Sequence, residues 1–171
     1  MELWDIYDTD RIPTGATAVR GEKLEKGAYH MVIHVCIFNS EGKMLIQQRQ
    51  PWKTYGDKWD VTVGGAAVKG DTSRDAAHRE LFEELGLDMD FSAMRPGLTM
   101  NFLTGFDDFY LINREVDISE LRLQPEEVKA VRWAELEEIE KLIDSGDFVP
   151  YFKSFIAMLF DIRNKPDCLN I

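Results

Sequence analysis

The chain has 171 residues, of which 44% are hydrophobic, and it carries 20 Lys and Arg against 31 Asp and Glu. This length supports one core, so we expect a single domain spanning residues 1–171. The formal charge of −11 repels nucleic acid and anionic membranes at long range, which argues against both as partners. A phosphate-bearing ligand then requires a local group of cations or a metal ion.

The N-terminus and the cysteines indicate the cellular compartment. The first ten residues, MELWDIYDTD, are acidic and lack the order of a signal peptide, and no apolar run approaches membrane-spanning length. Cys36 and Cys168 have neither metal-ligand spacing nor the pattern of a disulfide framework. We therefore expect a cytoplasmic protein that does not cross a membrane.

The first half of the chain is typical of sheet strands. Residues 29–38 are apolar and β-branched, the turn NSEGK follows with Gly42 where a positive φ is expected, and MLIQQR comes next. This order predicts a β-hairpin. The stretch WDVTV, residues 59–63, predicts a short strand that ends at Gly64 and Gly65.

The second half begins with a helical pattern over residues 73–85, with Asp71, Thr72 or Ser73 as the N-cap and Gly86 as the stop. Further strands are expected at residues 99–103, 108–112 and 128–133, and further helices at 134–145 and 151–163. Strands interleaved with a central helix and followed by helices predict an α/β sandwich with a mixed sheet. The aromatic stretch YFKSFIAMLF in the last helix predicts a core or homodimer contact. His34 and Cys36 are expected in the core.

The central helix contains the segment RELFEELG, residues 79–86. At about 100° per residue, Glu80, Glu83 and Glu84 share one narrow arc. The side expected to face the sheet carries Ala77, Leu81, Phe82 and Leu85. A solvated surface is the ordinary reading of a glutamate-rich helix. However, like charges at this spacing destabilise a helix by about 0.2–0.5 kcal/mol per pair, and no lysine is interleaved. A hard cation such as Mg²⁺ would offset that repulsion.

A glycine-rich loop, GGAAVKGD, joins the strand at 59–63 to this helix. Loop and helix together resemble the Nudix box, the signature of the Nudix hydrolase family, at Gly65, Asp71, Arg79, Glu80, Leu81, Glu83, Glu84, Gly86 and Leu87. Asp71 stands where the family pattern has glutamate. The resemblance implies the family's α/β/α sandwich, with the box forming a loop, a helix and a loop beside a mixed sheet.

The resemblance also implies a reaction, in which water attacks a phosphorus of a pyrophosphate with Mg²⁺ or Mn²⁺ as cofactor. The implied metal ligands are the Gly65 carbonyl and the side chains of Glu80, Glu83 and Glu84. The implied catalytic residues are Glu80 and Glu83, with Arg79 orienting the acids. Family members take the general base either from the box or from a distant glutamate. Glu126 and Glu127 are the distant candidates here, and Glu127 is our choice; an exposed acidic turn is the other reading.

The substrate is expected at the segment QQRQPWKTYGDKW between two predicted strands. Arg49, Lys53 and Lys58 can bind phosphate, and the neighbouring aromatic rings can contact a base. Amphipathic cover is an equal alternative for such a loop. The substrate class that the resemblance implies is a nucleoside diphosphate linked to another group, or a related small diphosphate.

Two other functions stay open. Residues 30–65 look like isopentenyl-diphosphate isomerase, a Nudix-fold enzyme, which has a cysteine and a histidine where this chain has Gly64 and Ala66. A sensor that binds nucleotides without turnover would keep the fold, but degenerate boxes usually lose acids, and all three helix glutamates remain. RNA cap removal would need a basic track, which the sequence lacks.

Overall fold

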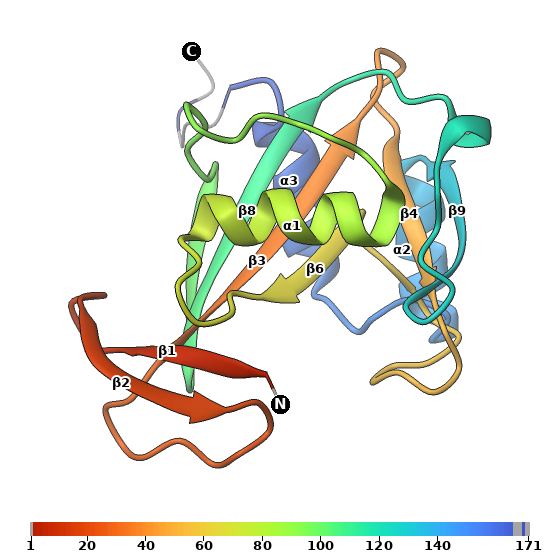
Figure 1. Ribbon diagram of the computed structural model, residues 1–171. Helices are drawn as coiled ribbons and strands as arrows, with labels where there is room; N and C mark the ends of the chain where they lie inside the picture. The colour runs from red at the N-terminus through yellow and green to blue at the C-terminus, as the bar shows by residue number, and fades with distance from the viewer. Residues whose placement is uncertain (1, 166–168, 170–171) are drawn as a thin grey trace.

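The computed structural model describes residues 2–165 and 169. Figure 1 shows a twisted central sheet whose hydrogen-bonded strand order is β5-β4-β3-β8-β7, with β6 paired to β3 and β9 paired to β4. The strands are β3 (His30–Phe38), β4 (Met44–Arg49), β5 (Trp59–Asp60), β6 (Val63–Ala66), β7 (Leu98–Phe102), β8 (Gly105–Asn113) and β9 (Val128–Ala134). Strands β3 and β8 are parallel and the other pairs are antiparallel, so the sheet is mixed.

Helices cover both faces of this sheet. Helix α1 (Ser73–Leu85) crosses the front in Figure 1, whereas α2 (Leu136–Ser145) and α3 (Lys153–Ile162) lie behind it. Because side chains alternate across a strand, β3 supplies Ile33 and Val35 to the core under α1 and Cys36 and Phe38 to the core under α2 and α3. The predicted α/β/α sandwich with a mixed sheet is confirmed.

Helix α1 has the predicted bounds. Its N-cap is Thr72, whose hydroxyl accepts from the Asp75 backbone while the Asp75 carboxylate accepts from the Thr72 backbone, and it ends at Gly86 in the left-handed conformation. Leu81 and Leu85 are fully buried as expected. The prediction that Phe82 faces the sheet is wrong: its side chain is 53% exposed, because it lies at the edge of the apolar arc and packs beside His78.

The two central strands are connected differently from the sequence prediction. Gly42 has the expected positive φ of 77°, but β3 and β4 pair only at Phe38 and Met44 and then diverge, so the hairpin prediction holds only at the turn.

The expected strand at 59–63 is divided into β5 and β6. Thr62 causes the break, because its hydroxyl donates to the Leu45 carbonyl and accepts from the Ile37 backbone in place of ladder bonds.

An N-terminal hairpin was missed by the sequence analysis. Strands β1 (Leu3–Tyr7) and β2 (Pro13–Val19) form a separate two-stranded sheet that projects at the lower left of Figure 1. Its attachments to the main body include the stacking of Trp4 on His30 at 4.2 Å between ring centroids and an ion pair between Arg11 and the buried Asp108. The segment contains acidic residues, and it turns at Arg11, whose φ is 63°. These features are not typical of strands, so the sequence pattern did not predict the hairpin.

The remaining elements agree with the predictions to within three residues, and a 3₁₀ turn lies at Ile118–Glu120. Helix α3 buries Ile156, Leu159 and Phe160, which confirms its core role. Cys36 is buried in the core, and Cys168 lies outside the described residues. Within the described chain, no helix has the length and apolarity needed to span a membrane.

Candidate active site

The carboxylates of α1 gather against the end of β6. Glu84 is 5% exposed and the Glu80 side chain 15%, whereas the Glu83 side chain is 49% exposed. Gly65 lies directly opposite Glu80, because a Cβ built on Gly65 would meet the Glu80 carboxyl carbon at 2.2 Å. Glycine at position 65 is therefore a packing requirement, and it lets the Glu80 carboxyl group lie directly against the backbone of β6.

Arg79, which the resemblance assigns to orienting the acids, lies between them as a cation. Its guanidinium donates to Glu80 at 2.9 Å, to Glu83 at 3.3 Å and to the Ala66 carbonyl at 3.1 Å. Two further bonds, of 3.0 and 3.1 Å, go to Asp71. The argument that three repelling glutamates require a metal is therefore corrected, since Arg79 neutralises part of their charge. Asp71 reaches Arg79 although it is one methylene shorter than the family's glutamate.

Glu84 has the most perturbed carboxyl group of the site. Burial raises its pKa to about 8, and the negative charge of Glu80 adds to this effect. The Gln47 amide of β4 donates to Glu84 at 2.9 Å. The Gln47 carbonyl oxygen is buried without a hydrogen-bond partner among the described residues. A buried acid beside an unsatisfied oxygen indicates a place prepared for a ligand.

The loop that carries the distant glutamates is held against α1. The backbone N–H of Gln124 donates to the Glu84 carbonyl at 2.9 Å, and that of Arg122 donates to the Leu85 carbonyl at 3.0 Å. Glu127, at the end of this loop, is close enough for its charge to raise the pKa of Glu84. The structure therefore brings Glu127 next to the box helix, although it follows Glu84 by 43 residues in the sequence. That it acts as the base stays a prediction.

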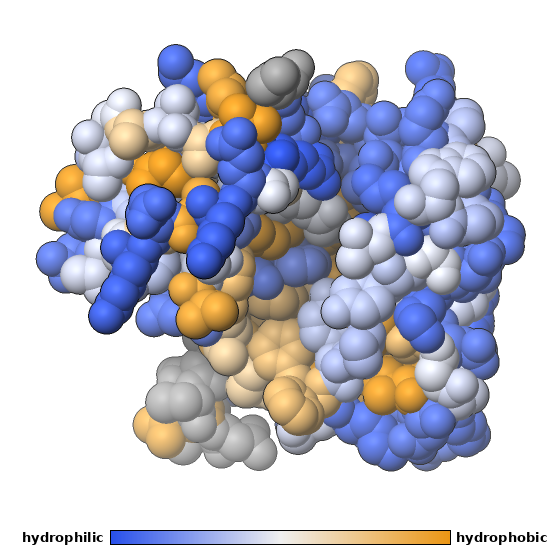
Figure 2. Space-filling view, turned by 90° about the horizontal axis from the view of Figure 1, so that it is seen from below, coloured by the Kyte–Doolittle hydropathy of each residue, from blue (hydrophilic) through white to orange (hydrophobic). Residues whose placement is uncertain are grey.

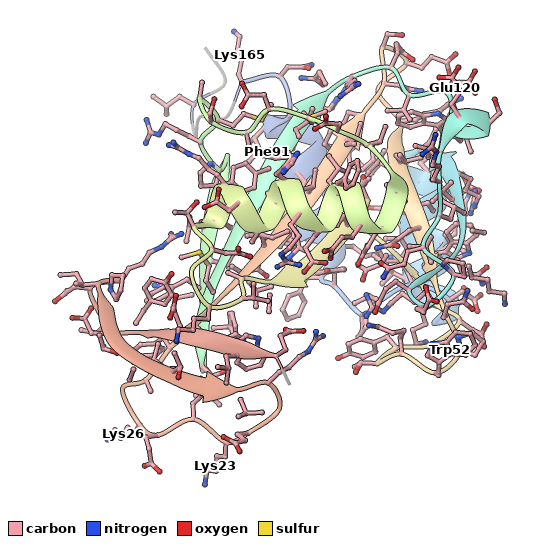
Figure 3. The ribbon with its side chains drawn as sticks, viewed as in Figure 1. Lys23, Lys26, Trp52, Phe91, Glu120 and Lys165 are labelled. Carbon is pink, nitrogen blue, oxygen red and sulfur yellow. The ribbon has the colours of Figure 1, made fainter. Side chains whose placement is uncertain are left out.

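The basic loop between β4 and β5 meets the same place. Lys53 forms an ion pair with Glu127, and the Trp52 indole donates to the Glu126 carbonyl at 3.0 Å. Figure 3 shows Trp52 at the lower right of the molecule, on the opposite side from Lys23 and Lys26. Lys53 is thus paired with the carboxylate that we predict as base.

Arg49 and Lys58 have different surroundings. Arg49 donates to Asp60 at 2.9 Å and to the Thr54 carbonyl at 2.8 Å, and its charge favours ionisation of Glu84. Lys58 donates instead to the Gly146 carbonyl at the C-terminal end of α2. The structure therefore places Arg49 and Lys53 around the carboxylates and does not place Lys58 there.

The oxygen donors suit a metal site that is completed by substrate. Among the described residues, no three His, Cys, Asp or Glu side chains form a ready-made metal cluster. Mg²⁺ ordinarily keeps several waters and uses one or two carboxylates together with substrate phosphates. Glu80, Glu84 and the open backbone at Gly65 fit that requirement, and the orphaned Gln47 oxygen is a further acceptor beside it.

Sequence reasoning missed Gln47, Asp60 and the cluster of His34, Asp107 and Tyr151 behind β6. His34 contacts Asp107 at 2.8 Å and Tyr151 at 3.3 Å, so the histidine assigned to the core lies in a polar network. Polar residues inside apolar strands were the available signal: Gln47 follows MLI, and Asp107 and Asp108 precede FYLI. Their partners come from distant segments, which one sequence does not reveal.

The fold and the acidic helix define a Nudix-type domain, and comparison with known proteins agrees. The model of the NUDIX domain family matches residues 28–152. The chain belongs to the Nudix family and is a Nudix hydrolase. It is 47% identical over 168 residues to a Nudix hydrolase of Listeria monocytogenes, with 96% of both chains covered. An isopentenyl-diphosphate Delta-isomerase of Pectobacterium atrosepticum is 29% identical, with 91% of this chain and 90% of that protein covered.

A solved structure supports the fold independently. A Deinococcus radiodurans protein superposes with a TM-score of 0.73 at 23% sequence identity, covering 94% of this chain and 98% of the other. A MutT protein from Methanosarcina mazei gives a TM-score of 0.60 at 25% identity and covers 84% of this chain and 99% of that one. The Nudix fold is therefore common to sequences that have diverged widely.

Proposed function

We propose that this Nudix hydrolase cleaves the pyrophosphate bond of a nucleoside diphosphate linked to another group, with Mg²⁺ or Mn²⁺ as cofactor. One observation carries the proposal: Glu80 packs on Gly65 beside the enclosed Glu84, and the charges of Arg49 and of Glu127, the partner of Lys53, act on Glu84. A strongly acidic protein that keeps cations at its carboxylate site is suited to a small anionic substrate.

Glu80, Glu84 and the Gly65 carbonyl would hold the divalent ion, with Glu83 as the more exposed ligand. When bound, the ion would neutralise phosphate oxygens and lower the pKa of a coordinated water. Its binding requires ionised Glu84, and the positive charge favours that form against the burial that now raises the pKa. Arg79 holds the Glu80 carboxylate in place from the other side.

Lys53 and Glu127 supply a second part of the mechanism. In the present structure their ion pair satisfies both charges. A substrate diphosphate competes for the Lys53 ammonium, which releases the Glu127 carboxylate to accept a proton from the attacking water. Arg49 orients the same diphosphate, since its guanidinium presents paired donors to phosphate oxygens.

The isomerase alternative is supported by the relative from Pectobacterium atrosepticum. The geometry at position 64 weighs against it. A Cβ on Gly64 would lie 2.6 Å from the His34 ring, so His34 fills the space that the isomerase cysteine would need. Cys36 is buried and burial raises its pKa, which makes it unsuited to proton transfer.

Two smaller proposals concern the cellular location of the protein and its oligomeric state. We propose a cytoplasmic enzyme in which residues 1–171 act as one unit, since Arg11 and Trp4 bind the N-terminal hairpin to the sheet. We also propose a homodimer in which Phe152, 83% exposed at the start of α3, contributes a contact. Light scattering of the parent protein and of Phe152→Ser tests this, and a monomeric parent would refute it.

A substrate panel tests the proposed function. Nucleoside diphosphates, triphosphates, nucleotide sugars, dinucleotides and isopentenyl diphosphate are incubated with Mg²⁺ or Mn²⁺, and products are followed by mass and phosphate release. Cleavage of a nucleotide diphosphate that chelation abolishes, and that Glu84→Gln lacks, is the expected result. Isomerised isopentenyl diphosphate, or binding without turnover, would contradict the proposal.

A further inference from the structure

A hollow of about 540 Å³ opens on the underside of the molecule, behind β6. In Figure 2, which views this underside, the surface is hollowed near the centre, and both apolar and hydrophilic side chains surround the depression. Three aromatic residues, Tyr55, Phe102 and Tyr151, line the hollow together with the aliphatic side chains of Val32 and Val149. Rings on several sides of a hollow provide stacking surfaces for a flat ligand.

Tyr55 is held at the hollow by an unusual backbone. Its φ is 57°, and Asp57 two residues later has a φ of 63°. Both are in the left-handed region, which is uncommon for residues other than glycine. The loop between them packs closely on Pro51 and needs glycine at position 56, because a Cβ there would overlap the Pro51 carbonyl at 2.1 Å. Tyr55 is nevertheless 50% exposed, so the strain is not compensated by burial of the ring.

Asp107 contributes the single carboxylate of the hollow. Its side chain is 17% exposed, and its Oδ1 lies 2.8 Å from Nδ1 of His34. Its Oδ2 has no hydrogen-bond partner within the described part of the chain. An N–H group of a ligand in the hollow can donate to this oxygen in place of water, and a hydrogen bond to a charged carboxylate is stronger than one between neutral groups.

The hydrogen bonds among Asp107, His34, Tyr151 and Asp60 determine the direction of the bond between His34 and Asp107. The Tyr151 hydroxyl donates its only proton to Asp60 at 3.2 Å, so its contact with His34 at 3.3 Å requires Nε2 of His34 to donate. His34 then carries protons on both nitrogens and donates to Asp107 through the other one. Asp107 thus accepts from His34 through Oδ1, and its other carboxylate oxygen can act as an acceptor for a ligand in the hollow.

The hollow is connected to the acidic site through Arg49. Arg49 donates to Asp60, which in turn accepts from Tyr151, the neighbour of His34. The positive charge of Arg49 lowers the pKa of both His34 and Glu84. Two consecutive glycines separate the two places: a Cβ on Gly64 would meet His34, and one on Gly65 would meet Glu80. Strand β6 therefore lies between His34 behind it and the carboxylate helix in front, and Arg49 is linked to the residues of the hollow through Asp60 and Tyr151.

We propose that the hollow binds the base of the substrate and selects bases with an exocyclic amino group, which donates to Oδ2 of Asp107. The inference rests on the proposed function, since it names the nucleoside part of that substrate. The aromatic rings would stack on the base, and Arg49 would receive the diphosphate. An oxo group at the same position presents lone pairs to the Asp107 carboxylate and is repelled. A prenyl group would leave the carboxylate unsatisfied, which separates this pocket from that of an isomerase.

Matched pairs of bases test the proposal. Adenine and hypoxanthine nucleotides differ by an amino against an oxo group, as do cytosine and uracil nucleotides. We expect the parent enzyme to favour the amino member of at least one pair by about ten- to hundredfold in kcat/KM, the range of one hydrogen bond to a charged group. Asp107→Asn should bring this ratio towards one, because its amide can turn either an oxygen or an NH₂ to the base.

Two controls keep the outcome decisive. Asp144→Asn removes a carboxylate on α2 that pairs with Lys153 and lies outside the hollow, and it should leave the ratio unchanged. If Asp107→Asn fails to fold because His34 loses its partner, Tyr55→Ala removes a stacking ring from an exposed loop and should weaken binding of both members of the pair. Equal use of amino and oxo bases by the parent, or a ratio unaffected in Asp107→Asn, would overturn the proposal.

Binding of products separates this inference from the proposed hydrolysis. The affinities of AMP against IMP and of CMP against UMP are measured by calorimetry without turnover. A preference for the amino member with no cleavage of any diphosphate would support the base pocket and refute the hydrolysis of nucleotides. Cleavage of nucleotide diphosphates with no base preference would support the hydrolysis and refute the pocket.

Discussion

The two sides of strand β6 differ in how the sequence encodes them. On the α1 side, Arg79, Glu80 and Glu84 come from one short segment, and the helix brings them together. On the other side, His34, Asp107 and Tyr151 come from three distant segments and meet only in the folded chain. The first side has residues suited to general phosphate chemistry, and the second has residues suited to choosing a ligand. Under the two proposals above, the reaction and its specificity are encoded in different parts of the sequence, and Arg49 joins them.

The largest expected effect comes from removing a carboxylate on the α1 side. Glu84→Gln should lower kcat by about 10²–10⁴-fold, the range for loss of a group that acts on protons or charge in the transition state. Glu83→Gln, at a side chain that is half exposed, should cost much less. Kinetics of both variants at saturating Mg²⁺ measure this, and equal losses would contradict the distinction between enclosed and exposed acids.

The same Glu84→Gln variant should gain stability in the absence of metal at high pH. Because burial raises the Glu84 pKa to about 8, its ionised form is disfavoured in the folded protein. The folded state therefore loses stability relative to the unfolded chain as pH rises from about 4.5 to 8. Denaturant unfolding in chelator should show the variant more stable than the parent at pH 9 and little changed at pH 4. A variant less stable at pH 9 would contradict the assignment.

Substitutions at Gly64 and Gly65 should each change the packing on one side of β6 and leave the other side intact. Gly65→Ala places a methyl against Glu80 and should lower kcat about 10- to 100-fold through misplacement of that acid. Gly64→Ala places a methyl against His34 and should cost about 1–3 kcal/mol of stability from overpacking, with a shift in base preference. Kinetics and thermal unfolding of both variants test this. The reverse assignment of effects would show that β6 does not separate the two sides.

Arg49→Lys should affect both sides at once. Lysine keeps the charge but cannot hold Asp60 and a diphosphate with paired donors, so kcat/KM should fall about tenfold. Lys58→Arg is the matched control, because Lys58 contacts the end of α2. Steady-state kinetics measure both, and an unchanged kcat/KM in Arg49→Lys would remove the proposed link between the sides.

The smallest expected effect is the change with pH in the stability that His34 contributes. Burial opposes the charged imidazole, but the hydrogen bond and the charge of Asp107 outweigh it and raise the pKa of His34. The resulting stabilisation is complete below the unfolded pKa of about 6.5 and is lost as pH rises through the folded pKa. The stability difference between the parent and His34→Gln should therefore narrow above neutral pH. A constant difference from pH 5 to 9 would mean that His34 is neutral throughout.

The sequence predicted the parts of the molecule that depend on local patterns. Helix α1, its acidic arc and the glycine opposite Glu80 follow from periodicity and fixed spacing. The division of the strand at 59–63 depends on hydrogen bonds of Thr62 to two other strands, so a local pattern could not show it. The N-terminal hairpin depends on the attachment of Arg11 to Asp108, nearly 100 residues away. Arg79 was visible in the sequence, but the neutralisation of Glu80 and Glu83 depended on its side-chain direction.

Isotope transfer from solvent tests the central claim most directly. The parent enzyme is incubated with a nucleotide sugar and Mg²⁺ in water enriched in ¹⁸O, and the products are examined by mass spectrometry. Our account predicts one ¹⁸O in one of the two phosphate products, because water attacks one phosphorus and the bridging oxygen leaves with the other. It also predicts no labelled product above background from Glu84→Gln. Products without the label, or labelled products formed equally by Glu84→Gln, would contradict hydrolysis at this site.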